Sequence, residues 1–140
     1  MAADKKTFIR NAQKQVQKGQ LDRAIASYKA ILKIDKNDEK IHNALGDLYI
    51  RKGQKSDGIQ EYLWVADWYE KDGFHLRSIA ICQKILNLDS TLAPVRLKLA
   101  DLYSEQRLPA EAKTQYLQVA DFAGRQFIFI IVDDSQADIR

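Results

Sequence analysis

The chain has 140 residues, of which 46% are hydrophobic and 29% are charged, with only six Gly and two Pro. This composition is typical of a soluble, helix-rich protein and excludes a disordered or fibrous one. The net charge of +3 arises from 22 basic and 19 acidic residues that are interspersed along the chain. An excess this small predicts neither nucleic acid nor an anionic membrane as a partner.

The cysteine content and the ends of the chain limit the compartment. The single cysteine, Cys82, excludes an intramolecular disulfide and a cysteine-rich metal site. Residues Met1 to Arg10 are charged and lack the apolar core of a signal peptide. The longest apolar run, Phe127 to Val132, is far shorter than the roughly 20 residues that span a bilayer as a helix. We therefore expect a cytoplasmic protein.

Apolar residues recur three and four positions apart through most of the chain, as Ala24, Ile25, Tyr28 and Ile31 do, which is the spacing of one buried helical stripe. The pattern predicts seven helices, at about 4–18, 21–34, 39–52, 56–71, 75–88, 93–106 and 109–123. The short turns between them are marked by Gly19, Gly53 and Gly73, which tolerate a positive φ. Polar connectors are predicted at 35–38 and 89–92, where Asp38 is placed to cap a helix and Pro94 suits a first turn.

The sequence repeats itself at two distances. Residues 19–35 and 73–89, which are 54 apart, are identical at seven of 17 positions, and 41–68 and 95–122 are identical at nine of 28. A shorter period of 34 residues relates Gly19 to Gly53 and Tyr28 to Tyr62. Repeats of this length indicate a helical array in which each unit packs on its neighbours.

These residues resemble the tetratricopeptide repeat family over roughly residues 5–126. The second repeat carries His42, Leu45, Gly46, Tyr49, Gly58, Tyr62 and Val65, and the last unit carries Leu99, Ala100, Tyr103, Ala112, Tyr116 and Val119. The first repeat departs from the pattern, with Asn11 and Gln15 where leucine and tyrosine are usual. The resemblance implies an all-α, right-handed superhelical solenoid of antiparallel helix pairs, formed by residues 1–126, with a concave groove.

The longer period leaves the pairing of the later helices open. A period of 54 residues contains three helices, so helix 56–71 matches both the first and the second helix of a pair. Helix 75–88 has the sequence of a second helix, whereas strict alternation makes it a first helix. Close helix contacts are predicted at the small residues Ala24, Gly46, Ala66 and Ala100, with tyrosines filling the remaining space.

The groove implied by the resemblance binds extended peptides or partner helices. Its predicted lining in the early repeats is Gln13, Gln17, Asn43, Asp47 and Arg51. Asp47 belongs to a recurrent set with Asp67, Asp101 and Asp121, which are either groove residues or structural residues, namely solvated side chains or partners for Lys and Arg of the next helix. Trp64, Trp68 and Phe74 either anchor a partner or belong to the core. His42 and His75 lack ligand spacing, and Cys82 is expected to be buried.

Residues 127–140 do not continue the repeat. The run Phe127 to Val132 has the composition of a buried β-strand, and Asp133 and Asp134 follow it. The segment resembles the opening of a response-regulator receiver domain, in which such an acidic pair helps to bind Mg²⁺. The alternatives are an unrelated apolar tail or a truncated end.

No phosphate-binding loop, nucleophile elbow or zinc-ligand spacing occurs in the sequence, so we expect neither an enzyme nor a cofactor. The predicted function is a non-catalytic scaffold that binds a protein or peptide partner through the groove. The alternative is the scaffold portion of a larger two-component signalling protein. The partner and the oligomeric state are not specified by the sequence.

Overall fold

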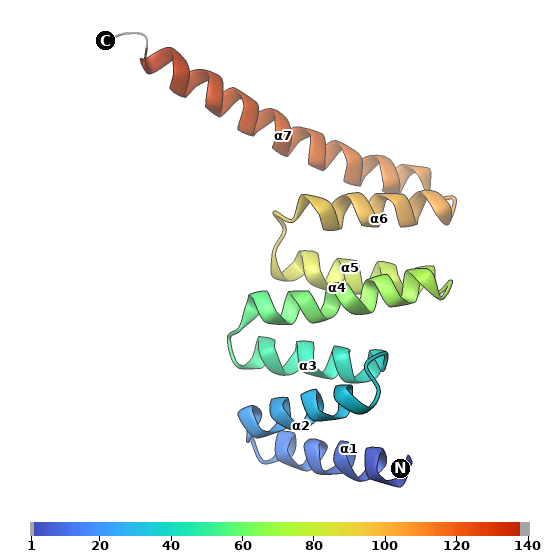
Figure 1. Ribbon diagram of the computed structural model, residues 1–140. Helices are drawn as coiled ribbons and strands as arrows, with labels where there is room; N and C mark the ends of the chain where they lie inside the picture. Colours follow the sequence, from blue (N-terminus) through green and yellow to red (C-terminus); the bar gives the residue numbers. More distant parts are fainter. Residues whose placement is uncertain (1, 138–140) are drawn as a thin grey trace. The chain divides into compact units, whose positions relative to one another are not determined.

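The computed structural model describes the backbone of residues 2–137 and the side chains of residues 4–125. The described backbone forms seven helices and no strand, which confirms the all-α class (Figure 1). The helices are α1 (Ala2–Gln17), α2 (Leu21–Ile34), α3 (Glu39–Arg51), α4 (Lys55–Lys71), α5 (His75–Leu88), α6 (Ala93–Glu105) and α7 (Pro109–Ala137). The chain divides within α5 into two compact units, Met1–Ile81 and Cys82–Arg140.

In the first unit, α1 to α4 stack in chain order and run in alternating directions (Figure 1). Each of these helices contacts the next one along the chain. The apolar stripes predicted for the first three helices meet in one buried cluster, which consists of Ala12, Ala24, Ile25, Tyr28, Ile31, Ile41, Leu45, Leu48 and Tyr49. Packing of each element against its sequence neighbours is the arrangement of a helical solenoid.

Four of the six turns share one hydrogen-bond pattern. The backbone N–H groups of Gln20, Gln54, Phe74 and Leu108 each donate to a carbonyl five residues earlier, at 2.8–2.9 Å. The residue before each donor has a positive φ, at Gly19, Gly53, Gly73 and Arg107. This is the Schellman motif, in which a left-handed residue ends the helix. The turns predicted at the three glycines are confirmed, and Arg107 takes the glycine position in the fourth.

The other two connections depend on aspartate. Asp35 accepts a hydrogen bond from the backbone N–H of Asn37 at 3.3 Å, and Asp89 accepts one from that of Thr91 at 3.0 Å. These connections lead into α3 and α6, where Asp38 caps α3 through the N–H groups of Lys40 and Ile41 and Pro94 lies in the first turn of α6. Both predictions about helix starts are therefore confirmed.

The order of the turns resolves the assignment of α5. The sequence of connections is Schellman, aspartate, Schellman, and then the same three again, so the turns repeat with the period of three helices that the sequence indicated. Helix α5 is entered through a Schellman turn and left through an aspartate connection, as α2 is. The turns on either side of α5 thus agree with its sequence, which is that of a second helix. Strict alternation of first and second helices therefore breaks down at α4.

A pair of small residues twelve positions apart accompanies each Schellman turn. The four pairs are Ala12 and Ala24, Gly46 and Gly58, Ala66 and Ser78, and Ala100 and Ala112, and every member is buried. In the third pair, the Ser78 hydroxyl donates to the Ala66 carbonyl oxygen at 2.8 Å. The close contacts predicted at Ala24, Gly46, Ala66 and Ala100 are buried as expected, because only small side chains let two helix backbones approach.

The contact between α3 and α4 leaves no room for a side chain at either of its two glycines. A Cβ atom at Gly46 would lie 2.5 Å from Cε1 of Tyr62, and one at Gly58 would lie 2.6 Å from Cδ1 of Ile50 and 3.1 Å from the Gly46 carbonyl oxygen. Each glycine therefore makes room for a side chain that its partner helix carries one turn away. The ring of Tyr62 occupies the space that a side chain at position 46 would fill.

The prediction of a strand at Phe127 to Val132 is wrong, because the backbone there is helical and belongs to α7. An apolar run without proline suits a buried helix as well as a strand, and a helix satisfies its backbone hydrogen bonds without a second strand. The side chains of Asp133 and Asp134 lie outside the described residues. Across the described part of the chain, no helix combines the length and apolarity needed to cross a membrane.

Two glycine-to-alanine substitutions are expected to change stability in opposite directions. Gly46→Ala should lower the free energy of unfolding by about 1–2 kcal/mol, because the added Cβ overpacks against the buried ring of Tyr62. Gly124→Ala in α7 meets nothing within 4 Å and should raise it by up to about 1 kcal/mol through helix propensity. Thermal melts followed by circular dichroism measure both. If both variants melt at a higher temperature, α3 and α4 do not approach closely at Gly46.

A second matched pair of substitutions tests the left-handed backbone position in the turns after α3 and α6. Arg107 has φ 58°, and Gly53 at the equivalent turn has φ 84° with nothing within 4 Å of an added Cβ. Arg107→Gly should therefore stabilise the chain by about 1 kcal/mol, and Gly53→Arg should destabilise it by a similar amount, because the left-handed region is strained for residues with a side chain. Chemical denaturation of the two variants tests this. A loss of stability in Arg107→Gly would contradict it.

Candidate functional site

Helix α3 presents three of the five predicted groove residues on one face. Asn43, Asp47 and Arg51 follow each other at intervals of four, which places them along one stripe of the helix. Asn43 is half-buried, whereas Asp47 and Arg51 are exposed. The buried stripe of Ile41, Leu45 and Leu48 lies on the opposite side and anchors this face to the core.

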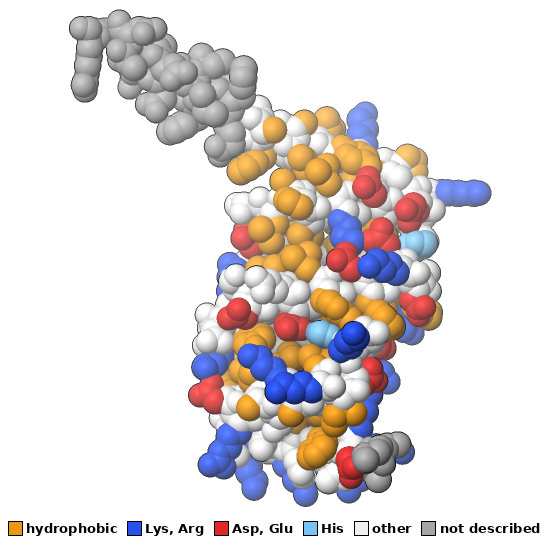
Figure 2. All heavy atoms as spheres, in the orientation of Figure 1, with side chains coloured by type: hydrophobic (Ala, Val, Ile, Leu, Met, Phe, Trp, Pro, Cys, Tyr) orange, Lys and Arg blue, Asp and Glu red, His pale blue; other side chains and the backbone are white. Residues whose placement is uncertain are grey.

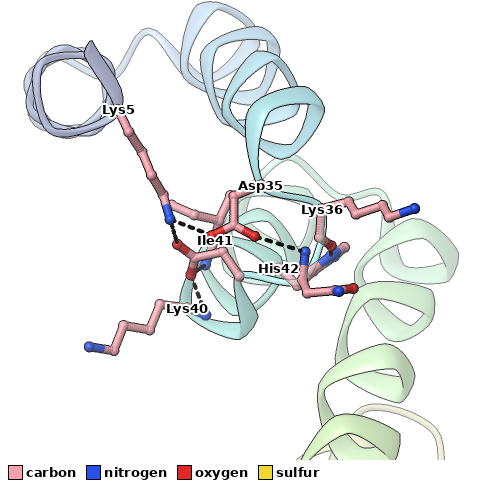
Figure 3. A network of polar contacts seen from close by, with 8 residues as sticks. Lys5, Asp35, Lys36, Lys40, Ile41 and His42 are labelled. Carbon is pink, nitrogen blue, oxygen red and sulfur yellow. Dashed lines mark hydrogen bonds and ion pairs between the residues drawn. The ribbon is translucent and has the colours of Figure 1, made fainter. Parts of the chain in front are cut away.

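The start of α3 is fixed by a charged network that joins three helices (Figure 3). The ammonium group of Lys5 on α1 lies 2.7 Å from Oδ2 of Asp35 and 2.8 Å from Oδ2 of Asp38. Its hydrogen bond to Asp35 lowers the pKa of that carboxyl group, and the two carboxylates raise the pKa of Lys5. Because Asp38 also caps α3, the network holds the first turn of α3 near α1.

Asp47 has a structural contact that the sequence analysis did not predict. Its Oδ1 accepts a hydrogen bond from the hydroxyl of Tyr62 on α4, whose side chain is only 1% exposed. Burial and the Asp47 carboxylate both raise the pKa of Tyr62. The same contact recurs 54 residues later, where Tyr116 donates to Asp101, although Tyr116 is 39% exposed.

The recurrent aspartates therefore do not share one role. Asp47 and Asp101 are exposed and pair with tyrosines, whereas the structural interpretation expected solvated side chains or partners among the Lys and Arg of the next helix. Asp121 pairs with Arg125 of its own helix at 2.9 Å, and both side chains are largely exposed. Asp67 is exposed on α4.

Asn43 is the one residue of the predicted groove with an unmet hydrogen-bonding need. Among the side chains that the structure describes, its Oδ1 is buried and has no donor. A buried amide oxygen without a partner costs about 1–3 kcal/mol. Apolar or small residues at this position would avoid that cost, so packing alone does not account for an asparagine here.

The two groove candidates on α1 are placed differently. Gln13 and Gln17 are exposed and lie one turn apart on the same side of α1. Within the described part of the chain, neither side chain forms a hydrogen bond with Asn43, Asp47 or Arg51. The structure thus groups the α3 candidates on one helix face and leaves the α1 candidates on another.

A stack of three rings joins α3 to α4 and was not foreseen from the sequence. His42 stacks on Trp64 with ring centroids 3.7 Å apart, and Trp64 stacks on Trp68 at 5.5 Å. Nδ1 of His42 lies 2.6 Å from Oε2 of Glu61, and Nε2 lies 2.9 Å from the carbonyl oxygen of Lys36. Both ring nitrogens therefore face acceptor atoms. His42 is therefore a packing residue of the α3–α4 contact.

The other aromatic and cysteine predictions have clear outcomes. Trp64 and Trp68 are half-buried and stacked, so they act as packing residues. Phe74 is 45% exposed and contacts Tyr69 edge to face, with the guanidinium of Arg77 4.7 Å from its ring centroid. Cys82 is fully buried, as expected. No group of three His, Cys, Asp or Glu residues that suits a metal ion occurs in the described part of the chain.

Comparison with known proteins supports the repeat family for part of the chain. Residues 13–53, from the second half of α1 to the turn after α3, match the family model described as TPR repeat. No curated protein matches the chain. The segment that matches contains Asn43, Asp47, Arg51, Gln13 and Gln17.

Several solved structures are similar to the chain in fold. MamA from Desulfovibrio magneticus RS-1 has 15% identity over 87% of this chain and 77% of its own, with a TM-score of 0.49. A crystal structure of MamA has 22% identity over 79% of this chain and 72% of its own, with a TM-score of 0.44. The type III secretion translocator chaperone SycD of Yersinia enterocolitica has 16% identity over 86% and 75%, with a TM-score of 0.45. At this level of similarity, these structures carry no inference about function.

Proposed function

We propose that this chain is a non-catalytic scaffold that binds a protein or peptide partner through the polar face of α3, with Asn43, Asp47 and Arg51 as its contacts and Gln13 and Gln17 of α1 as a flanking contribution. The match of residues 13–53 to the TPR repeat supports protein binding as the general role. The observation that carries the assignment to α3 is the buried oxygen of Asn43 without a donor.

The hydrogen-bonding groups of this face suit a polypeptide. Asn43 offers an amide that can both accept from and donate to a peptide backbone, and Arg51 offers a fork of donors for carbonyl or carboxylate oxygens. Asp47 is exposed on this face, and its carboxylate is an acceptor for N–H groups as well as for the hydroxyl of Tyr62. The face therefore holds an acceptor, a donor and an amide along a little over two turns of one helix, a length of about 12 Å that a short extended peptide or a partner helix can cover.

Removing the amide of Asn43 is expected to separate stability from binding. Asn43→Ala should raise the free energy of unfolding by about 0.5–2 kcal/mol, because it removes the unsatisfied oxygen and favours the helix. The same variant should weaken partner binding by about tenfold, which corresponds to one lost contact of moderate strength. Denaturant titration and a binding titration measure the two effects. A variant that is less stable and binds normally would show that Asn43 is a structural residue.

The charged residues of α3 provide a direct test of the binding face. In a pull-down with the full chain, Asp47→Asn with Arg51→Glu should lose proteins that the unchanged chain captures, since both charges of the face are altered. Asparagine retains the Oδ1 acceptor for Tyr62, so the core should stay intact. Lys113→Glu, which alters an exposed residue of α7, serves as the control and should capture the same proteins as the unchanged chain. Equal capture by all three chains, with unchanged helicity, would rule out the α3 face.

A further inference from the structure

The outward face of α1 carries a row of cations. Lys6, Arg10, Lys14 and Lys18 follow each other at intervals of four, and all four are exposed. Lys18 lies just beyond the end of α1, but its N–H still donates to the Lys14 carbonyl at 3.1 Å, so it continues the helical turn. Successive charges are therefore roughly 6 Å apart along the helix axis. Figure 2 shows Lys and Arg side chains along the edge of the molecule that α1 forms.

These four cations have no partner in the described part of the chain, which contains no ion pair or hydrogen bond to their side chains. Lys5, which is also on α1, differs from them because its ammonium group pairs with Asp35 and Asp38. Like charges at intervals of four repel each other on a helix. The remaining residues of this face are uncharged, and they are Thr7, Asn11, Gln13 and Gln17.

The low net charge of the chain conceals this segregation. Residues 1–34 contain eight Lys and Arg and two Asp, a net charge of +6. One of those two, Asp22, is paired with Lys52 of the turn after α3. Residues 35–81, which complete the first unit, contain seven basic and nine acidic residues, a net charge of −2. The positive potential of the first unit is thus concentrated on its first two helices.

We propose that the row Lys6, Arg10, Lys14 and Lys18 is a docking surface for an acidic α-helix of a protein partner. Acidic residues at every fourth position of a helix repeat at the same roughly 6 Å interval as these cations, so charges of the two helices can pair along the row. The row is about 18 Å long, which suits a helix of three to four turns. A long polyanion such as a nucleic acid would run past this row and meet the net negative charge of residues 35–81.

The experiment uses the full chain and two synthetic peptides. The first is a labelled alanine-based helix with glutamate at every fourth position, and the second has the same composition with the glutamates scattered around the helix. Fluorescence anisotropy at low ionic strength should show the first peptide binding about tenfold more tightly than the second, and added salt should weaken the binding. Replacing Lys6, Arg10, Lys14 and Lys18 by glutamine should reduce the affinity for the first peptide by about tenfold or more.

A matched variant separates this surface from general charge attraction. Replacing Lys33, Lys55, Lys71 and Lys113 by glutamine removes the same charge from exposed positions elsewhere and should change the affinity by less than about threefold. Arg10→Gln with Lys14→Gln, confined to the middle of the row, provides the test if the fourfold α1 variant loses helicity. Asn43→Ala changes only α3 and should bind the peptide normally, so the α3 and α1 surfaces can fail independently.

Three results would overturn the proposal. If only total charge mattered, the two peptides would bind alike, so equal affinities would reject a helical match. Equal losses in the two fourfold variants would reject the α1 row as the site. Tighter binding of a 20-base-pair DNA duplex or of phosphatidylserine vesicles than of the first peptide, at the same salt concentration, would assign the row to a different class of partner.

Discussion

Close approach at paired small residues determines how successive helices of this chain pack. Gly46 and Gly58 show why, because each leaves the space that a side chain of the other helix fills, Tyr62 in one direction and Ile50 in the other. The pair lies twelve residues apart, on either side of a turn whose geometry depends on Gly53. A larger residue at either position would separate the backbones and displace the tyrosine. The hydrogen bond from Tyr62 to Asp47, and with it the orientation of a residue on the polar face of α3, depends on that close contact.

Helix α4 takes part in two such contacts, and this double use explains the period of three helices. Gly58 meets Gly46 of α3, and Ala66 accepts from Ser78 of α5. These positions are eight residues apart, so they point about 80° away from each other around the helix. One helix thus acts as the second member of one pair and the first member of the next. After Gly58, α4 carries Trp64, whose ring stacks on His42 of α3, and Trp68, whose ring stacks on Trp64.

Local rules made most of the fold predictable, and the exceptions have identifiable causes. Glycine at positive φ, aspartate at helix starts and small residues at crossings each have one dominant structural use, so their positions in the sequence located the turns and contacts. Arg107 gives no such signal, because arginine is not selected for a left-handed backbone. The tyrosine partner of Asp47 was missed because the contact joins residues fifteen apart on different helices. The apolar run at Phe127 suited strand and helix alike, and only its continuity with α7 distinguishes them.

The two candidate surfaces share a property that the core lacks, which is that each is destabilising in the isolated chain. Asn43 buries an oxygen without a donor, and Lys6, Arg10, Lys14 and Lys18 repel each other without a counter-charge. At the helix junctions of the first unit, by contrast, Lys5, Asp38, His42 and Ser78 all have partners. These polar groups at the helix junctions have partners within the described part of the chain, whereas the amide oxygen of Asn43 and the four cations do not. A second molecule bound at these faces would provide the missing partners. A polypeptide backbone would provide the hydrogen bond that the amide oxygen of Asn43 lacks, and an acidic helix would provide counter-charges for the row of cations. One protein partner can supply both.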